Sequence, residues 1–124
     1  MKNGLHIGSN GDKYWFHNGQ RHRSDGPAVE YADGDKWWYQ KGCLHRLDGP
    51  AIELNNGTKF WYQNGQPHRL DGPAAEFTDG DKYWVVRDKD ITNEVNAWFE
   101  ETGFSSDYEN WTDEEKTFFA MKWS

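Results

Sequence analysis

Short runs of aromatic residues recur along the chain with a period of 23 residues, and each run leads into a turn signal. The runs cover residues 14–16, 37–39 and 60–62. The turn signals that follow them are Asn18-Gly19, Lys41-Gly42 and Asn64-Gly65. Asn-Gly after a β-forming run favours a two-residue hairpin loop, because both residues of a type I′ turn have positive φ. A second short strand follows in each copy, so we predict one strand pair per copy, with the copies adding edge to edge.

Three copies of the repeat follow one another without a gap, and a fourth begins at residue 80. The full copies cover residues 11–33, 34–56 and 57–79. The fourth copy opens with Gly-Asp-Lys-Tyr-Trp and then loses the motif. Repeat arrays need atypical units at their ends. We therefore predict one domain in three parts: a degenerate half-repeat at residues 1–10, the repeats at 11–88 and an acidic helical cap at 89–124.

The charged residues indicate the register of the second turn. A three-residue loop with Gly34 in the left-handed region places Glu30 opposite Lys36, whereas a two-residue loop would set each such glutamate beside an aromatic ring. The same register gives two further pairs, Glu53 with Lys59 and Glu76 with Lys82. One face then carries these pairs and a tryptophan column (Trp15, Trp38, Trp61, Trp84), and the other carries a second set of aromatic residues.

These elements predict a mainly β fold. We expect a single-layer twisted antiparallel sheet of about seven or eight short strands, built from β-hairpin repeats and capped by short C-terminal α-helices. After residue 88 the periodicity becomes helical, and Thr92 is a candidate N-cap for a helix that ends at Gly103. Thr112 and Glu115 have the spacing of a capping box before a second helix.

The copy that runs from Trp15-Phe16-His17-Asn18-Gly19-Gln20-Arg21-His22 to Ala32-Asp33-Gly34 resembles the MORN repeat family. Units of that family are β-hairpins of the same period, and the resemblance covers about residues 11–88. The chain departs from the family pattern after each His, where Arg23, Arg46 or Arg69 stands in place of glycine and the next glycine lies in Asp-Gly-Pro-Ala. This His-Arg-x-Asp-Gly-Pro-Ala variant is similar to repeats in small bacteriophage and bacterial proteins. The resemblance implies an elongated antiparallel sheet used for protein contacts or dimerisation, with membrane association in some eukaryotic members, and implies no catalytic activity.

Composition narrows the class of partner. The chain of 124 residues has 14 Lys and Arg against 21 Asp and Glu, so its net charge is −7 and direct binding to nucleic acid is disfavoured. Eight Trp, six Tyr and seven Phe indicate an aromatic core. Cys43 is the one cysteine and lies in no zinc-ligand spacing. Because no signal peptide or membrane-spanning stretch stands out, we expect a soluble cytoplasmic protein, in the host cytoplasm if a phage encodes it.

The His-Arg-x-Asp-Gly-Pro-Ala cluster brings an acid, a base and a cation together in each copy. Adjacent copies are expected two strands apart, roughly 10 Å, which is too far for three histidines to share one metal ion. We interpret these residues as structural repeat positions: His22, Asp25, His45, Asp48, His68 and Asp71. No nucleophile–base pair, paired carboxylates or phosphate loop stands outside the repeats. We therefore predict no catalytic residue, no metal, no cofactor and no enzymatic activity.

Charge is concentrated at the C-terminal end, where residues 88–124 hold ten acidic residues and three lysines. We predict that this surface docks on a basic protein partner, such as a nucleic-acid-binding host protein. The predicted contact residues are Glu100, Glu101, Asp107, Glu109, Asp113 and Glu114. A sharper hypothesis is an inhibitor, encoded by a phage, that occupies the nucleic-acid groove of a host or defence protein. The plainer interpretation is that the two helices only cap the sheet and that their carboxylates are solvated.

A competing hypothesis places the binding surface on the sheet. In an antitoxin-like or scaffold protein, exposed aromatic residues would contact the partner, and Trp38 and Trp61 are the candidates. A homodimer through an edge strand or an aromatic face is a further expectation. Peripheral membrane attachment is a third hypothesis, which the acidic balance opposes because cytoplasmic leaflets are anionic.

Overall fold

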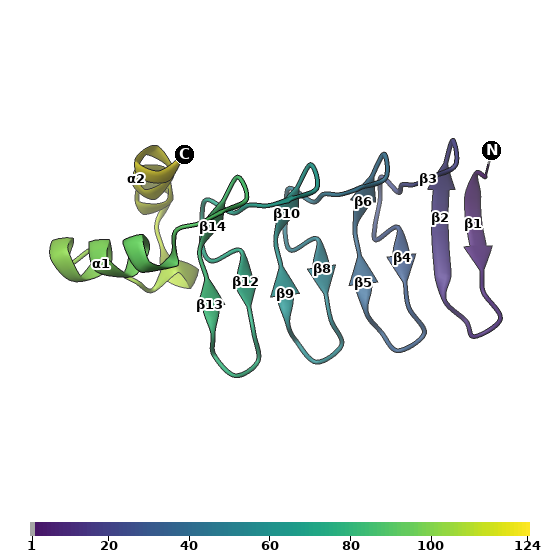
Figure 1. Cartoon of the computed structure of the whole chain (residues 1–124), viewed down its shortest axis with the longest axis horizontal. Helices are drawn as coiled ribbons and strands as arrows, with labels where there is room; N and C mark the ends of the chain where they lie inside the picture. Colours follow the sequence, from purple (N-terminus) through teal and green to yellow (C-terminus); the bar gives the residue numbers. More distant parts are fainter. Residues whose placement is uncertain (1) are drawn as a thin grey trace.

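The computed structural model describes residues 2–124 and shows an open row of antiparallel strands with helices at one end (Figure 1). The chain begins at the other end of the row, so the molecule is elongated. The main sheet consists of β1 (Gly4–Ile7), β2 (Lys13–His17), β4 (Val29–Glu30), β5 (Lys36–Trp37), β8 (Ile52–Glu53), β9 (Lys59–Phe60), β12 (Ala75–Glu76) and β13 (Lys82–Tyr83), in that order, with β3 (Gln20–Arg21) beside β2. The predicted fold class is confirmed.

Three further hairpins stand in a row beside the main sheet (Figure 1). They are β6 (Tyr39–Gln40) with β7 (Cys43–Leu44), β10 (Tyr62–Gln63) with β11 (Gln66–Pro67), and β14 (Val85–Val86) with β15 (Lys89–Asp90). Each arises because the strand of the second, third or fourth copy is interrupted at its tryptophan. The Trp38 N–H donates to the carbonyl of Ala51, just before β8 of the main sheet, while the Trp38 carbonyl accepts from the N–H of His45, just after β7 of the hairpin. The expected seven or eight strands describe the path of the main sheet, but sequence analysis missed these breaks.

The predicted register of the second turn is confirmed. Glu30 lies opposite Lys36, and Gly34 has a φ of 101° in a three-residue loop closed by the pair Tyr31 and Asp35. The other two predicted pairs, Glu53 with Lys59 and Glu76 with Lys82, are also formed. Neighbouring copies pair in the same register, so lysine and glutamate alternate across seven strands: Lys13, Glu30, Lys36, Glu53, Lys59, Glu76 and Lys82. Each charge therefore has the opposite charge beside it.

The tight turns have the predicted positive φ at both central residues, with values of 50° at Asn18 and 78° at Gly19. The fourth copy keeps this turn without a glycine, since Arg87 and Asp88 have φ values of 49° and 67°. The hairpin geometry thus continues to Asp90, although the sequence motif fades earlier. Edge pairing to the third copy supports this turn, because the Asp88 N–H donates to the Pro67 carbonyl.

Two helices and a short 3₁₀ turn form the cap: α1 (Thr92–Thr102), η1 (Tyr108–Asn110) and α2 (Asp113–Trp123). They close over Trp84 at the end of the tryptophan-bearing face, and Trp84 keeps 4% of its surface exposed. The buried cluster around it contains Val86, Ile91, Val95, Tyr108, Trp111 and Phe119. The main hydrophobic core therefore lies between the last copy and the cap.

The two predicted helix starts have different outcomes. Thr112 and Glu115 form both hydrogen bonds of the capping box, and Gly103 ends α1 with a φ of 71°, as expected. Thr92 was wrongly predicted as an N-cap. Ile91 occupies that position, and the Thr92 hydroxyl instead accepts from the Trp84 N–H and donates to Asp90. The hydroxyl thus ties α1 to the last copy.

Candidate functional site

Each full copy stacks an arginine on the tryptophan of the same copy. The guanidinium carbon lies 3.9 Å from the ring centroid in the pairs Arg23–Trp15 and Arg46–Trp38, and 3.8 Å in the pair Arg69–Trp61. A planar guanidinium over an indole gains both cation–π attraction and dispersion. We call this series of three stacked pairs the Trp–Arg ladder. It follows the same face as the alternating lysines and glutamates.

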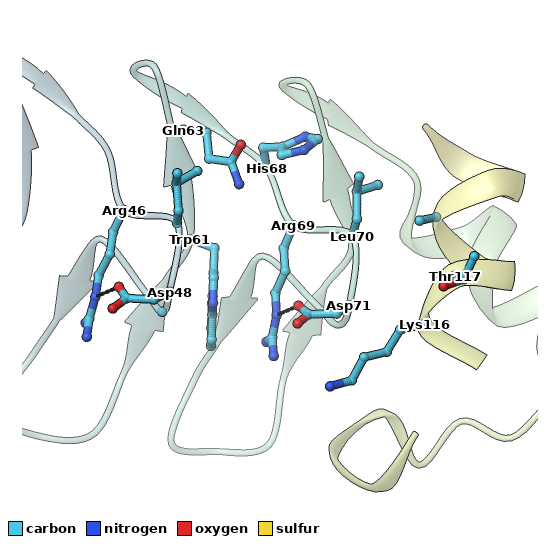
Figure 2. A pocket seen from close by; sticks show the side chains of 13 residues that line it. Arg46, Asp48, Trp61, Gln63, His68, Arg69, Leu70, Asp71, Lys116 and Thr117 are labelled. Carbon is cyan, nitrogen blue, oxygen red and sulfur yellow. Dashed lines mark hydrogen bonds and ion pairs between the residues drawn. The ribbon is translucent and has the colours of Figure 1, made fainter. Parts of the chain in front are cut away.

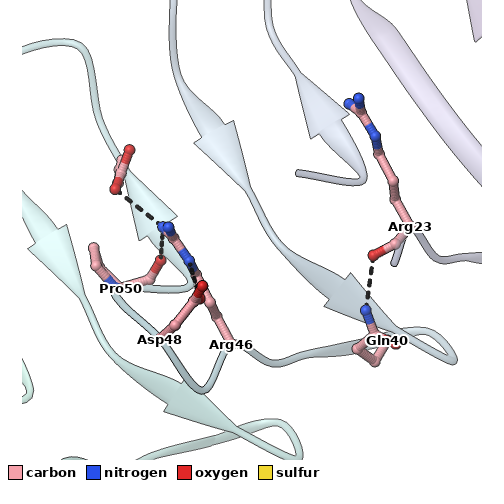
Figure 3. Close-up of polar contacts among 6 residues, drawn as sticks. Arg23, Gln40, Arg46, Asp48 and Pro50 are labelled. Carbon is pink, nitrogen blue, oxygen red and sulfur yellow. Dashed lines mark hydrogen bonds and ion pairs between the residues drawn. The ribbon is translucent and has the colours of Figure 1, made fainter. Parts of the chain in front are cut away.

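The Asp-Gly-Pro part of the motif holds the arginine in place. In the second copy, Arg46 Nε donates to Asp48 at 2.9 Å, while its Nη1 donates to the Pro50 carbonyl at 3.1 Å and to Glu53 at 3.1 Å (Figure 3). A Cβ on Gly49 would approach the Arg46 guanidinium carbon to 2.9 Å, so the close stack requires glycine there. The neighbouring guanidinium lowers the pKa of the Asp48 carboxyl. Each predicted structural aspartate thus forms an ion pair with the stacked arginine of its own copy. These aspartates are Asp25, Asp48 and Asp71.

The repeat histidines link one copy to the next. The Nδ1 atom of His22 accepts from the Lys41 N–H at 2.9 Å, and His45 accepts from Asn64 at 3.0 Å in the same way. His68 accepts from Arg87 at 2.9 Å, and burial together with the Arg87 charge lowers the pKa of His68. Each of these bonds joins a histidine ring to the backbone of the tight turn in the following copy, so the three histidines hold successive copies together. At the N-terminal end, the side-chain oxygen of Asn3 accepts from Asn18 at 2.8 Å in place of a histidine.

Two open grooves lie between successive copies on the face of the Trp–Arg ladder. The first groove has a volume of about 1000 Å³, with Arg23 and Asp25 on one side and Trp38 on the other. The second groove has a volume of about 530 Å³, with Arg46 and Asp48 on one side and Trp61 on the other. Lys116 of α2 borders it as well. Figure 2 shows Trp61 standing between Arg46 and Arg69, so one ring face is stacked and the other borders the groove. The partner-binding candidates Trp38 and Trp61 therefore line these grooves.

The corresponding position between the third and fourth copies is filled by the cap. The Tyr108 ring lies 5.6 Å from the Trp84 ring, edge to face, and 5.6 Å from the Arg69 guanidinium carbon. Its hydroxyl donates to Glu76 at 2.6 Å, and the Lys82 ammonium lies 5.6 Å from the ring. Burial and the bond to Glu76 raise the pKa of Tyr108 well above its usual range. Sequence analysis missed this role, because Tyr108 lies outside the repeats and in a 3₁₀ turn that no periodicity marks.

The predicted acidic docking residues all lie exposed on the cap. Glu100 and Glu101 are near the end of α1, Asp107 and Glu109 flank Tyr108, and Asp113 and Glu114 begin α2. Every ion pair found within residues 2–124 involves Arg23, Arg46 or Arg69, so the carboxylates of the cap have no cationic partner in the described chain. The structure brings these six residues to one end of the molecule and leaves them in solvent.

The opposite face of the sheet carries a second aromatic series, whose members range from half-buried to exposed. Tyr31 lies edge to face with Tyr14 and Trp37, at centroid distances of 6.3 Å and 6.2 Å, and Phe77 does the same with Phe60 and Tyr83 at 5.5 Å and 5.7 Å. A shallow groove of about 270 Å³ lies beside the second set. Both faces of the single layer are therefore aromatic, as the register implied.

Within residues 2–124, no group of three His, Cys, Asp or Glu side chains is arranged to hold a metal ion, and no helix has the length and apolar character to span a bilayer. Cys43 is an exposed free thiol. No family model matches the sequence, and comparison with curated proteins and with solved structures found no significant match. Kinship with MORN repeats therefore stays a proposal that depends on the repeat motif alone.

Proposed function

We propose that the protein is a non-enzymatic protein-interaction module, in which the repeats are a scaffold and the acidic cap docks on a basic protein partner. The observation that carries the proposal is the contrast between two sets of carboxylates. Those of the ladder are paired with arginine, whereas the six predicted docking residues of the cap are exposed and have no cation beside them in the described chain. Unpaired charge of one sign at one end of a molecule steers and orients a partner of opposite charge.

Salt dependence tests this proposal. Lysate of a bacterial host is passed over the immobilised protein, retained proteins are identified by mass spectrometry, and the retained partner is then titrated at two ionic strengths. We expect capture of a basic protein and a loss of affinity of at least about tenfold between roughly 50 and 500 mM salt, because exposed charges are screened. Binding that does not change with salt would contradict the proposal.

Substitutions then locate the surface. A variant with amides at all six positions (Glu100→Gln, Glu101→Gln, Asp107→Asn, Glu109→Gln, Asp113→Asn, Glu114→Gln) should lose binding. A control removes half as many charges, from exposed acids of the repeat loops (Asp33→Asn, Asp79→Asn, Asp88→Asn). Asn at positions 33 and 79 keeps the side-chain oxygen that accepts from the loop N–H groups. If the control loses about half as much binding free energy as the cap variant, net charge is responsible and the cap surface is not.

We propose an inhibitor of a host or defence protein as the sharper form of this function. Support comes from the resemblance to repeats of small phage proteins and from the exposed acidic cap, which could occupy a basic nucleic-acid groove. The test is competition: the protein should displace DNA or RNA from the captured partner, and the six-amide cap variant should not. Simultaneous binding of nucleic acid and this protein would contradict the inhibitor form.

A second candidate function is a scaffold or antitoxin-like protein that binds through the sheet. The open grooves that contain Trp38 and Trp61 favour it, because a half-exposed tryptophan between two arginines is available to a partner side chain. In this case capture survives high salt and the six amides, and is lost with Trp38→Ser or Trp61→Ser.

A further inference from the structure

We propose that the two open grooves of the Trp–Arg ladder each bind a tyrosine side chain of a partner polypeptide. This inference rests on the second candidate function, binding through the sheet, and names the chemistry that the grooves recognise. The observation behind it is internal to the chain: the cap fills the third position of the same series with several aromatic rings around Trp84, and Tyr108 is the one that bonds to the glutamate there.

The three grooves are equivalent by the repeat. Tyr108 contacts Arg69, Glu76, Lys82 and Trp84. One period earlier, the same four positions hold Arg46, Glu53, Lys59 and Trp61, and one period before that Arg23, Glu30, Lys36 and Trp38. The pairing register places each Glu opposite its Lys in all three copies. The same four groups therefore recur at each open groove: the arginine and the tryptophan line it, the glutamate pairs with that arginine, and the lysine lies opposite the glutamate on the next strand.

The exposed fractions of the three glutamate side chains agree with one filled groove and two open grooves. The Glu76 side chain, under the Tyr108 hydroxyl, is 21% exposed, whereas Glu53 and Glu30 are 35% and 31% exposed. The arginine–glutamate distance does not separate the two kinds of groove, since it is 3.6 Å in the filled one and 3.6 Å and 3.1 Å in the two open ones. In the filled groove the phenol provides the shorter bond to the glutamate, at 2.6 Å. A tyrosine that enters an open groove would take over the same acceptor.

The groups of the groove select a phenol over other side chains. The arginine and the lysine favour the electron-rich face of an aromatic ring and repel an incoming cation. The glutamate is a charged hydrogen-bond acceptor, and a phenylalanine in the groove would offer it no donor. A site built around a hydroxyl discriminates against the analogue that lacks it. Tyrosine satisfies each of these preferences. Its ring face would contact the two cations, its ring edge would contact the indole, and its hydroxyl would donate to the carboxylate.

The spacing of the grooves indicates how two tyrosines would be presented. Successive grooves are two strands apart, about 9.5 Å at the usual interstrand distance. In polyproline II conformation, residues i and i+3 lie on the same side of the chain about 9.3 Å apart. A proline-rich Tyr-x-x-Tyr segment therefore fits both open grooves at once, and it carries little ordering cost because its conformation exists before binding.

The experiment uses the full chain, labelled with ¹⁵N, and follows its indole N–H signals by NMR. The probe is the peptide acetyl-Pro-Tyr-Pro-Pro-Tyr-Pro-amide, and matched peptides carry Phe or Ala in place of both tyrosines. The signals of Trp38 and Trp61 are assigned with the variants Trp38→Phe and Trp61→Phe. Trp84, whose groove is filled, is the internal control. We expect the Trp38 and Trp61 signals to shift while the Trp84 signal stays, with about fivefold weaker binding of the Phe peptide and no saturable shift with the Ala peptide.

A second variant keeps the fold and alters the recognition. Glu30→Gln with Glu53→Gln retains an oxygen acceptor but removes the charge, so the preference for Tyr over Phe should fall to about twofold or less. Equal shifts with all three peptides, a shift of Trp84 alone, or no shift at millimolar peptide would overturn the proposal. If a captured partner still depends on Trp38 and Trp61 but the tyrosine peptide does not bind, the tyrosine chemistry is wrong and binding through the sheet stands. If the tyrosine peptide binds but no captured partner depends on these tryptophans, the groove chemistry stands and the second candidate function fails.

Discussion

Four residues of each repeat motif have separate physical tasks that together align one copy with the next. In the second copy His45 accepts a backbone N–H from the following copy, Arg46 stacks on Trp38, Asp48 pairs with the arginine, and Gly49 leaves room for it. An acid, a base and a cation so close together resemble a catalytic group, yet every one of them has a structural partner. The motif is therefore conserved from copy to copy within this chain for reasons of packing.

The first prediction concerns the stacked arginine. Arg46→Lys keeps the charge but removes the planar fork that contacts Trp38, Asp48 and the Pro50 carbonyl together. We expect the free energy of unfolding to fall by about 1 kcal/mol, measured by urea denaturation. Arg87→Lys is the matched control, because Arg87 is exposed in a turn, and it should leave stability unchanged. An equal effect of the two substitutions would show that the stack contributes nothing.

The second prediction concerns pH. Burial and Arg87 lower the pKa of His68 in the folded chain, so the unfolded chain binds a proton more readily. The contribution of His68 to stability is therefore complete above the unfolded pKa of about 6.5 and is lost as pH falls through the lower, folded value. His68→Asn keeps an acceptor, as Asn3 does for Asn18, and cannot titrate.

The check is the urea midpoint at pH 7.5 and pH 5.0. The midpoint should drop less in His68→Asn than in the unmodified chain, with His17→Asn, an exposed histidine, as the control. A drop of the same size in His68→Asn would mean that His68 is not a source of the pH dependence.

At the scale of the elements, the capping box is the best-defined local signal of the cap. Thr112→Ala removes the acceptor for Glu115 N–H at the start of α2 and should lower the free energy of unfolding by about 1 kcal/mol. Thr117→Ala, within the same helix and exposed, is the control and should have no destabilising effect because alanine favours helix. Near-UV circular dichroism of the aromatic cluster around Phe119 reports the same loss on heating. If Thr112→Ala melts like the unmodified chain, packing alone holds the helix.

The sequence predicted the parts of the fold that obey local rules. The residue types at Asn18-Gly19 were sufficient to predict the tight turns. The charge pairing of Glu30 with Lys36 was sufficient to predict the strand register and which residues share each face of the sheet. The breaks at the tryptophans could not be predicted from the repeat, since Trp15 makes the same two backbone bonds as Trp38 and yet stays within a continuous strand, which pairs with β1. The role of Thr92 was missed because its acceptor role toward Trp84 is a tertiary contact.

The candidate surfaces were only partly predictable. The acidic cap could be located from charge alone, and its six predicted contact residues are exposed. The grooves required the structure, because they form between copies and depend on which ring face of Trp61 the arginine covers. The occupant of the third groove also required it, since no spacing links Tyr108 to Glu76.

At the scale of the whole molecule, strand pairing runs from each copy to the next, so stability is expected to be nearly a sum of copies and interfaces. Deleting residues 34–56 joins Asp33 to Gly57 and preserves the period. We expect a folded chain of lower stability, with the circular dichroism spectrum retained and the maximum dimension in small-angle X-ray scattering shortened by about 10 Å. Loss of cooperative unfolding in this deletion, but not in a control that lacks only Lys2, would contradict the additive description.

The tyrosine of the cap contacts groups that every copy presents, and this has a consequence for how such chains can vary. The cap also packs on Val86 and Ile91, where the third copy has Gln63 and His68, so the fourth copy together with the cap forms an end unit that can terminate an array of any length. Copy number is then free to change by duplication or loss of whole units without a redesign of the end. Each copy gained or lost would change the distance between the acidic surface and the N-terminal edge by about 10 Å. The length of the molecule could therefore vary while the contacts within it stay the same.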